Sequence, residues 1–203
     1  EVDTVLVSRV EGQLQEGEQD LQTCLQAEPM AQAAATGADD IGFWLYSSGS
    51  TGQPKGTVHT HGNPYWTSKL YGEGVLGIGE QDICFSAAKL FFAYGLGNAL
   101  TFPLSVGATS VLLAGRPTPD IIYQRLREHQ ATIFFGAPTG YVAMLAAADL
   151  PAPDTLALRL AVSAGEALPA ELAQRFTRHF GIDVIDGIGS TEMLHIYISN
   201  RPG

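Results

Sequence analysis

Residues 158–192 read LRLAVSAGEALPAELAQRFTRHFGIDVIDGIGSTE, and a strand–helix–strand unit can be traced through them. The apolar runs 158–162 and 182–185 are typical of strands. Between them, residues 169–180 are predicted to form a helix, because basic residues stand in the last turn and Gly181 follows as a stop signal. A strand that continues through a helix into a second strand favours a parallel sheet.

The same alternation extends through most of the chain. Further strands are predicted at residues 83–87, 109–113, 132–135 and 194–198. Further helices are predicted at residues 64–71, 96–103, 119–129 and 138–148. The expected fold class is therefore α/β, with layered, largely parallel sheets and flanking helices. Ligands then bind beyond the carboxyl ends of the strands, where turns contain Gly136, Gly165 and residues 187–189.

The first 38 residues have a different character. Residues 2–7 alternate like a strand, residues 11–20 read as an acidic solvated loop, and residues 21–35 have helical composition interrupted by Pro29. We interpret residues 1–38 as a separate segment with an acidic linker, distinct from the alternating strands and helices of residues 39–203. Because the sequence starts at Glu1 and stops just after an apolar run, we expect an internal fragment of a longer protein, with a C-terminal domain absent.

Composition excludes several function classes. The 203 residues are 45% hydrophobic and 16% charged, as in a globular protein. A net charge of −10 argues against nonspecific nucleic-acid binding. No apolar run approaches the roughly 18 residues of a membrane span. The two cysteines, Cys24 and Cys84, have no metal-type spacing, and we expect them to be reduced in a cytoplasmic protein without nucleic-acid or membrane partners.

Residues 46–56 read YSSGSTGQPKG, a stretch whose composition suits a polyphosphate. Glycines let the backbone N–H groups approach an anion, hydroxyls donate to phosphate oxygens, and Lys55 adds a full positive charge. The spacing is not that of a Walker loop, because counting from Gly49 puts Pro54 and Gly56 where glycine and Ser/Thr are required. The flanking runs 43–46 and 56–60 predict a hairpin with a long turn; a merely flexible loop is the alternative.

Two other patterns carry weaker signals. Residues 72–77, GEGVLG, have dinucleotide-motif spacing but follow a helix-like segment rather than a strand, so we interpret them as a loop. His59 and His61 are expected to share one face of a strand, but no third ligand is evident and a zinc site is not favoured.

Residues 46–56 closely resemble the signature loop of the adenylate-forming enzymes, which include acyl-CoA synthetases, peptide-synthetase adenylation domains and luciferases. Residues 186–192, DGIGSTE, resemble the Gly-x-Thr-Glu motif of that family, and residues 163–169, SAGEALP, resemble its adenine-flanking loop. Residues 89–97, KLFFAYGLG, and 189–196, GSTEMLHI, are similar to the benzoate–CoA ligase group within the family. The resemblance covers about residues 39–203, with three motifs in family order. It implies that residues 39–203 are a nucleotide- and acyl-binding core, that residues 1–38 are the end of a preceding subdomain with an acidic linker, and that the C-terminal domain of the family is absent.

The resemblance implies an ATP-dependent acid–thiol ligase that makes an acyl adenylate and then a thioester, with Mg²⁺, ATP and coenzyme A taking part. It assigns catalytic roles to Thr191 and Glu192, with Glu192 also holding Mg²⁺. The ATP phosphates would be bound by Ser47, Ser48, Gly49, Ser50, Thr51, Gly52 and Lys55. Adenine would be bound by Gly165, Glu166, Ala167, Asp186, Gly187 and Ile188. The aryl carboxylate would be bound by Phe92, Ala93, Tyr94, Gly189, His195 and Ile196, with Gly187 as a further candidate.

Some residues leave alternatives open. Ile188 stands where many family members carry an aromatic residue, and it would cover adenine by dispersion alone. Phe91 and Phe92 fit an ordinary core equally well. His195 either faces the ligand or caps nearby backbone.

Alternatives for the whole protein also stay open. The substrate is benzoate, 4-hydroxybenzoate or another aryl acid, and a noncatalytic nucleotide-binding module is the rival from another class. Family members carry a ribose-binding aspartate and a C-terminal lysine beyond the part matched here, so we expect this chain alone to be inactive. Many of them dimerise, and a homodimer of the full-length protein is a further alternative.

Overall fold

The computed structural model describes residues 3–47 and 52–203. The chain divides into two compact units, Glu1–Thr36 and Gly37–Gly203. The first unit has two short parallel strands, β1 (Val5–Val7) and β2 (Glu18–Asp20), followed by helix α1 (Leu21–Cys24).

This first unit corrects two predictions. Residues 18–20 pair as a strand, so the loop predicted over residues 11–20 is too long. The helix predicted over residues 21–35 ends at Cys24, and none of the four helical residues is buried in the described structure. A helix gains most of its stability by packing an apolar face, so propensity alone does not extend this one.

The second unit is built on a six-stranded sheet with the order β10-β9-β8-β7-β5-β6. Its strands are β5 (Ile83–Ser86), β6 (Thr109–Val111), β7 (Ile133–Gly136), β8 (Leu160–Ala164), β9 (Val184–Gly189) and β10 (Ile196–Ser199). All neighbours pair in parallel except β10, which runs antiparallel to β9. The predicted α/β class with a largely parallel sheet is confirmed.

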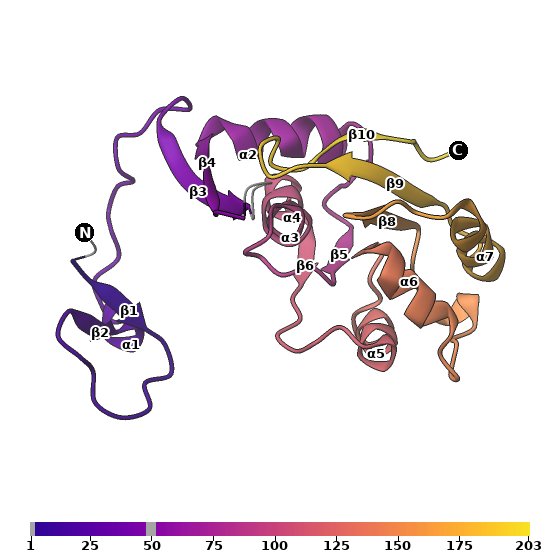
Figure 1. Cartoon of the computed structure of the whole chain (residues 1–203), viewed down its shortest axis with the longest axis horizontal. Coiled ribbons are helices and arrows are strands. Elements are labelled where there is room, and N and C mark those ends of the chain that lie inside the picture. The colour runs from indigo at the N-terminus through magenta and orange to yellow at the C-terminus, as the bar shows by residue number, and fades with distance from the viewer. Residues whose placement is uncertain (1–2, 48–51) are drawn as a thin grey trace. The chain divides into compact units, whose positions relative to one another are not determined.

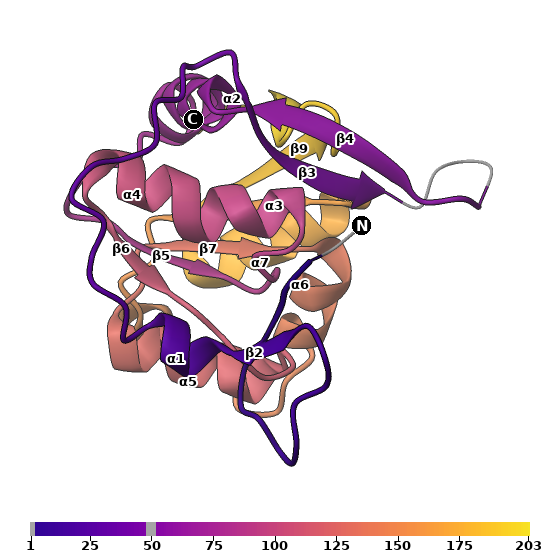
Figure 2. The ribbon, with the colours of Figure 1, turned by 90° about the vertical axis from the view of Figure 1, so that its left-hand side faces the viewer.

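Alternation along the central strands divides the core into two faces. Phe134 points toward one hydrophobic cluster, whereas its neighbours Ile133 and Phe135 belong to the other. The Phe134 face is covered by α5 (Pro119–His129), α6 (Pro138–Leu145) and α7 (Ala170–Phe180), as Figures 1 and 2 show. Both faces are buried, which explains why these strands are continuously apolar.

Two longer helical segments cover the opposite face (Figure 2). In one, α2 (Gly62–Thr67) continues into a π-helical turn, η1 (Ser68–Glu73). In the other, α3 (Ala93–Leu96), the π-helical η2 (Gly97–Thr101) and α4 (Phe102–Val106) follow one another. The predicted helix at residues 96–103 is therefore longer at both ends. It stops where Gly107 adopts φ 76°, a left-handed conformation that glycine adopts without strain.

Several predicted boundaries shift by a few residues. The helix predicted at 138–148 ends at Leu145, and a 3₁₀ turn, η3 (Pro153–Thr155), follows. The last predicted strand begins two residues late, at Ile196, because Leu194 has φ 66° and turns the chain before it.

A two-stranded antiparallel hairpin precedes the sheet. It consists of β3 (Ile41–Ser47) and β4 (Lys55–Thr60), which confirms the predicted hairpin. Among its described residues, His59 alone is buried. The prediction that His59 and His61 share a strand face is wrong, because β4 ends at Thr60 and His61 already has helical dihedrals ahead of α2.

A polar network joins the amino ends of three parallel strands. Arg159, just before β8, donates from Nε to Asp82 Oδ1 at 2.8 Å and from Nη2 to Oδ2 at 2.7 Å. Thr132, just before β7, donates from its hydroxyl to Asp82 Oδ1 at 2.7 Å. Asp82 lies immediately before β5, so one carboxylate ties three strand starts together. The opposite, carboxyl edge of the sheet is organised differently.

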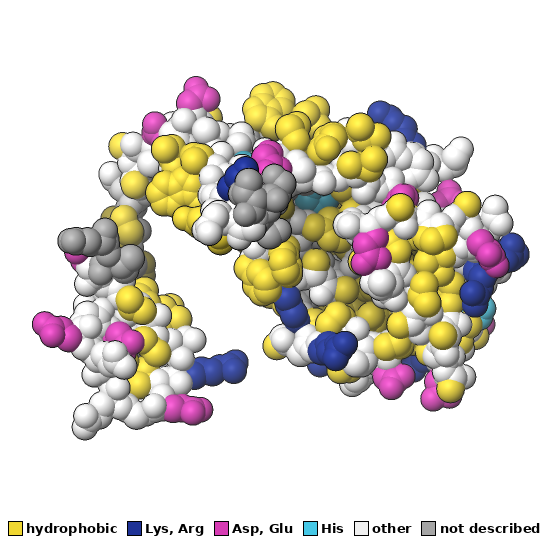
Figure 3. Space-filling view, viewed as in Figure 1, with side chains coloured by type: hydrophobic (Ala, Val, Ile, Leu, Met, Phe, Trp, Pro, Cys, Tyr) yellow, Lys and Arg dark blue, Asp and Glu magenta, His cyan; other side chains and the backbone are white. Residues whose placement is uncertain are grey.

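Exposed apolar side chains gather over α2, η1 and β10, at the top of the view in Figure 3. They are Tyr65, Trp66, Leu70, Tyr197 and Ile198. Such clusters are typical of surfaces that contact other protein segments. Within residues 3–47 and 52–203, no helix is long and apolar enough to cross a bilayer.

Candidate active site

A pocket of about 280 Å³ lies at the carboxyl edge of the sheet. It is lined by Ala88, Phe92, Ala93, Tyr94, Ala164, Gly165, Gly189, Ser190, Thr191, His195 and Ile196. These residues come from the turns after β5, β8 and β9, from the start of α3 and from the start of β10. The location agrees with the general placement of ligands in parallel α/β sheets.

The pocket brings together residues that lie far apart in the sequence. Of the candidates for the aryl carboxylate, Gly187 does not line it, and the other six do: Phe92, Ala93, Tyr94, Gly189, His195 and Ile196. Gly165, from the adenine set, and Thr191 line it as well. Sequence reasoning gave no role to Ala88, Ala164 or Ser190. Their signal is positional, since Ala88 follows the end of β5 by two residues and Ala164 is the last residue of β8.

The remaining candidates of the adenine and metal sets do not line this pocket. Glu166 and Ala167 are exposed in the turn after Gly165. Asp186, Gly187 and Ile188 lie on β9. Ile188 is 60% exposed, so its side chain is free to cover a ligand above the strand end. Glu192 is exposed in the turn directly after Thr191.

The hairpin carries the candidates for the phosphate site. Ser48, Gly49, Ser50 and Thr51 lie outside the described residues. Ser47, the last residue of β3, pairs with Lys55, the first residue of β4, so both stand at the loop end of the hairpin. Gly52 has φ 78°, a conformation that favours glycine, and both Gly52 and Lys55 are exposed.

His195 forms a buried part of the pocket wall. Its Nε2 lies 3.0 Å from Asn98 Oδ1, and its ring centroid lies 4.5 Å from that of Phe102. Burial lowers the pKa of His195 to about 3, so the imidazole is neutral at neutral pH. A Cβ on Gly97 would stand 2.4 Å from His195 Cδ2, which is why glycine is needed beneath this ring.

The aromatic residues of the 89–97 stretch have different environments. The Tyr94 hydroxyl donates to the backbone oxygens of Gly136 at 3.2 Å and Val162 at 3.1 Å, and burial raises its pKa well above the usual value. Phe91 and Phe92 are 71% and 57% exposed, so the alternative that both are ordinary core residues is wrong. Their rings pack against each other with centroids 4.4 Å apart.

Several buried polar atoms of the second unit have no hydrogen-bond partner among the described residues, and one of them, His195 Nδ1, belongs to a residue that lines the pocket. They are Tyr71 Oη, Asn98 Nδ2, Ser163 Oγ, Asp186 Oδ1 and His195 Nδ1. Such orphaned groups are rare in protein interiors and concentrate at functional sites. Asn98 was missed from the sequence, although a polar residue inside an apolar helical run is the signal that marks it.

One buried hydrogen bond connects the hairpin to the turn after β9. His59 Nε2 lies 2.9 Å from the backbone oxygen of Thr191, and His59 Nδ1 lies 3.1 Å from Asn63 Nδ2. The hairpin that carries Lys55 and the turn that carries Glu192 are thereby joined across 132 residues of sequence.

Glu192 lies near the pocket and suits a metal ion that is also bound by a ligand. Among the described residues, no cluster of three or more His, Cys, Asp or Glu side chains forms a complete metal cage. Mg²⁺ is commonly held by one or two carboxylates together with substrate phosphates. The exposed carboxylate of Glu192 beside Thr191 therefore fits such a site.

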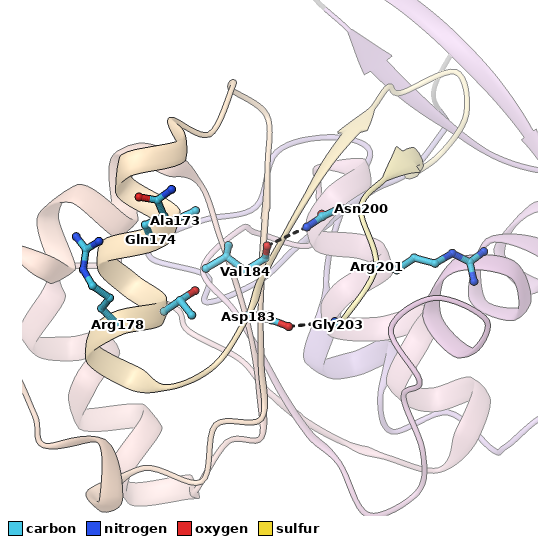
Figure 4. Close-up of a pocket in the computed structure, with 9 residues that line it drawn as sticks. Ala173, Gln174, Arg178, Asp183, Val184, Asn200, Arg201 and Gly203 are labelled. Atoms are coloured by element: carbon cyan, nitrogen blue, oxygen red, sulfur yellow. Dashed lines mark hydrogen bonds between the residues drawn. The ribbon is translucent and has the colours of Figure 1, made fainter.

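A second pocket, of about 390 Å³, lies between α7, β9 and the residues after β10 (Figure 4). Arg178 and Arg201 border it, Asn200 Nδ2 donates to the backbone oxygen of Val184 at 3.4 Å, and the backbone N–H of Gly203 donates to Asp183 Oδ2 at 3.1 Å. Its lining includes none of the residues assigned from the sequence motifs. The candidate site is therefore the smaller pocket at the carboxyl edge.

Comparison with known proteins decides the family. The profile of the family described as AMP-binding enzyme matches residues 1–203. The chain belongs to this family. The adenylate-forming resemblance of its motifs is thereby confirmed.

Relatives within the AMP-binding family act on aryl acids. The chain is 60% identical over 172 residues to the benzoate–CoA ligase of Thauera aromatica, covering 85% of this chain and 33% of that protein. It is 51% identical over 172 residues to the 4-hydroxybenzoate–CoA/benzoate–CoA ligase of Rhodopseudomonas palustris, covering 83% and 31%. This AMP-binding chain thus spans about a third of the length of these curated relatives.

Solved structures agree with this comparison. A benzoate CoA ligase from Burkholderia xenovorans LB400 matches with a TM-score of 0.85 and 61% identity, over 90% of this chain and 36% of that one. The anthranilate CoA ligase AuaEII in complex with anthranoyl-AMP matches with a TM-score of 0.90 and 43% identity, over 99% and 39%. The α/β core of this AMP-binding chain therefore has the architecture of aryl–CoA ligases.

Proposed function

We propose that this chain forms part of the large domain of an ATP-dependent benzoate–CoA ligase. The observation that carries the proposal is the pocket at the carboxyl edge, where six residues assigned to the aryl acid and Thr191 of the Thr-Glu motif converge. Family membership and 60% identity to a benzoate–CoA ligase support it. The chain spans only about a third of that relative, so the activity belongs to a longer protein.

The proposed reaction has two steps. A carboxylate oxygen of the aryl acid attacks the α-phosphorus of ATP, and the bond to the β-phosphate bridging oxygen breaks, giving an acyl adenylate and pyrophosphate. The sulfur of coenzyme A, having lost its proton, then attacks the acyl carbon, and AMP leaves with the electron pair of the acyl–oxygen bond. The first step brings anions together, so it depends on neutralising charge and aligning the attack.

The proposed phosphate site has two parts. Ser47 and Lys55 stand at the loop end of the hairpin, on either side of residues 48–54, and would hold the β- and γ-phosphates. Thr191, in the turn after β9, would donate its hydroxyl to the α-phosphate. Glu192 would hold Mg²⁺, which supplies charge neutralisation at the phosphates when bound.

The proposed acyl site has the shape and polarity for a flat ring. Ala93 and Gly189 leave room, Tyr94 and Ile196 provide apolar walls, and the neutral His195 adds no charge. Adenine would lie beyond Gly165, near the exposed Ile188 and residues 166–167. A pocket of this kind, mostly apolar with a few polar groups, is typical of small-molecule sites.

The surroundings of the protein are also part of the proposal. A reducing, cytoplasmic location stays a prediction from the sequence. Aryl acid, ATP and coenzyme A are the expected partners. A homodimer of the full-length protein stays a prediction.

The test is carboxylate-dependent exchange of labelled pyrophosphate into ATP, made with the complete protein that carries this chain. Benzoate, 4-hydroxybenzoate and acetate are compared side by side. Exchange with benzoate at least tenfold above acetate supports adenylation of an aryl acid. The ratio of the two aryl acids decides between the activities of the two curated relatives. Absence of exchange with either aryl acid would remove the benzoate assignment.

A further inference from the structure

His59 is the buried anchor of an otherwise exposed hairpin. On β4 it is 1% exposed, whereas its strand neighbours are exposed or half-buried. Its ring lies 5.3 Å from that of Phe43 on the partner strand. A two-stranded hairpin is marginal by itself, so the contacts of its buried residue decide how firmly it is held against the sheet.

The hydrogen bonds of His59 fix its tautomer. The backbone oxygen of Thr191 only accepts, so His59 Nε2 must carry the hydrogen and donate over 2.9 Å. Nδ1 is then the acceptor, and it faces Asn63 Nδ2 at 3.1 Å. Asn63 Oδ1 in turn accepts from the Thr60 hydroxyl at 3.2 Å. The result is a directed chain of three bonds from Thr60 to the Thr191 carbonyl.

The same carbonyl closes the turn that follows β9. The backbone N–H of Leu194 donates to the Thr191 oxygen at 3.1 Å, so this oxygen accepts from both Leu194 and His59. A carbonyl oxygen has two lone pairs, and both are used here. The side chain of His59 therefore takes part in defining the conformation of the Thr191–Leu194 turn.

We infer that His59 is a positioning residue that holds the Thr191–Glu192 turn in register with the hairpin that carries Lys55. This rests on the proposed function, in which both elements act on one triphosphate: Lys55 on the terminal phosphates, Thr191 and Glu192 on the α-phosphate and its metal. His59 itself touches neither substrate nor metal. It acts by fixing the backbone from which Thr191 and Glu192 project.

The decisive variants replace His59 with polar side chains of two different lengths. In His59→Gln the amide nitrogen occupies about the position of Nε2 and still donates to Thr191. In His59→Asn the side chain ends at about the position of Nδ1, so it keeps a polar partner for Asn63 but does not reach Thr191. The matched control is His179→Asn, because His179 Nε2 also lies 2.9 Å from a backbone oxygen, that of Pro151, away from the pocket.

The kinetic experiment measures pyrophosphate exchange by the complete protein, with ATP and benzoate varied separately. We expect His59→Asn to lower kcat/KM for ATP about tenfold, as for the loss of one part-buried hydrogen bond that positions the Thr191–Glu192 turn. The KM for benzoate should change less than twofold. His59→Gln should recover most of the rate, and His179→Asn should match the wild type. Equal rates for His59→Asn and the wild type, or no recovery in His59→Gln, would overturn the inference.

A second readout does not depend on activity. Hydrogen–deuterium exchange of a peptide covering residues 187–195 should rise in His59→Asn and return toward the wild-type level in His59→Gln. Peptides from β7 and β8 should exchange as in the wild type, which checks that the variants are folded. If the wild type shows no pyrophosphate exchange, the proposed function is wrong. Hydrogen–deuterium exchange still tests whether His59 positions the Thr191–Glu192 turn. Unchanged protection of residues 187–195 in His59→Asn would show that His59 does not position the turn.

Discussion

The two edges of the six-stranded sheet differ in how their buried polar groups are hydrogen-bonded. At the amino edge, the Asp82 carboxylate accepts from Arg159 and Thr132 and also from the backbone N–H of Gly79 at 2.9 Å. Burial would raise the pKa of Asp82, but these donors outweigh it and hold that pKa below its usual value. At the carboxyl edge, polar atoms of Ser163, Asp186 and their neighbours are buried without partners in the described structure.

The difference separates stability from function. A fully satisfied polar network rigidifies the start of the strands, whereas unsatisfied groups cost free energy and persist where a ligand completes them. Substitutions at the amino edge should therefore change stability and leave ligand binding alone. At the carboxyl edge the two effects should separate only for residues that project into solvent, such as Glu192.

The largest effect is expected at Glu192, the exposed residue of the carboxyl edge. Glu192→Gln in the complete protein should lower Mg²⁺-dependent pyrophosphate exchange about 100-fold, because an amide replaces the charged metal ligand. The KM for benzoate and the midpoint of urea unfolding should stay near wild type. Glu171→Gln, in the first turn of α7, is the matched control. An exchange rate within twofold of wild type would refute the metal assignment.

The amino edge is tested by Arg159→Met. It leaves the Asp82 side chain, which is 11% exposed, without its ionic partner. We expect a loss of about 2 kcal/mol in unfolding free energy, less than for a fully buried pair because the Arg159 side chain is 41% exposed. Urea unfolding measures the loss. Arg125→Met, which removes an exposed pair with Glu128 on α5, should leave the free energy of unfolding near that of the wild type. Comparable losses of unfolding free energy in Arg159→Met and Arg125→Met would show that the Asp82 network does not stabilise the amino edge more than an exposed ion pair does.

Steric crowding at the carboxyl edge predicts a difference between two glycines. In Gly97→Ala the new Cβ would meet His195 Cδ2 at 2.4 Å and Phe102 Cζ at 3.1 Å, so we expect about 1–2 kcal/mol of destabilisation and weaker benzoate binding. Gly140→Ala, on α6, meets nothing within 4 Å and should stabilise by up to about 1 kcal/mol. Thermal unfolding and benzoate titration measure both. A neutral Gly97→Ala would mean that His195 is free to move.

The buried His195 predicts a smaller, pH-dependent effect. Its pKa is lowered by burial from 6.5 to about 3, so the unfolded chain binds the extra proton first as the pH falls. The contribution of this residue to stability is therefore intact above about pH 6.5 and is lost between 6.5 and 3, at up to about 1.4 kcal/mol per pH unit. The neighbouring Tyr71 and Tyr94 stay neutral there, because burial raises the pKa of Tyr71 to about 12 and that of Tyr94 further.

The check is unfolding free energy from pH 7 to 5 for the wild type and His195→Phe. The variant should show a shallower decline, by about 1 kcal/mol per unit. Identical slopes would place the His195 ring in contact with water.

Prediction from sequence succeeded where local signals were strong. The apolar runs identified the strands of the sheet, because strands buried on both faces carry a continuous β-branched or aromatic pattern. The hairpin followed from two short runs around a Gly/Ser loop. The acyl-site residues come from two separate motifs and do line one pocket: Phe92, Ala93, Tyr94, Gly189, His195 and Ile196. Their roles in binding stay predictions.

Prediction failed where long-range packing decides. The helix expected after Leu21 stops at Cys24 because nothing in the described structure buries its face. Asn98 was missed and Gly97 received no role of its own, since their importance depends on His195, which lies 97 residues from Asn98. His59 was considered for zinc with His61, and the structure gives it Thr191 and Asn63 as partners instead.

The sequence by itself determined the order of strands and helices along the chain and the chemistry available in each motif, because periodicity, turn residues and charge are local properties. Its motifs also carried the resemblance to the family that the comparison then showed. Only the tertiary structure decided which of these residues meet. The sheet places β5, β8 and β9 so that their carboxyl ends border one pocket, and a single histidine joins the hairpin to the Thr191 turn. Such contacts depend on strand order and helix packing, which fix distances between residues that the sequence separates.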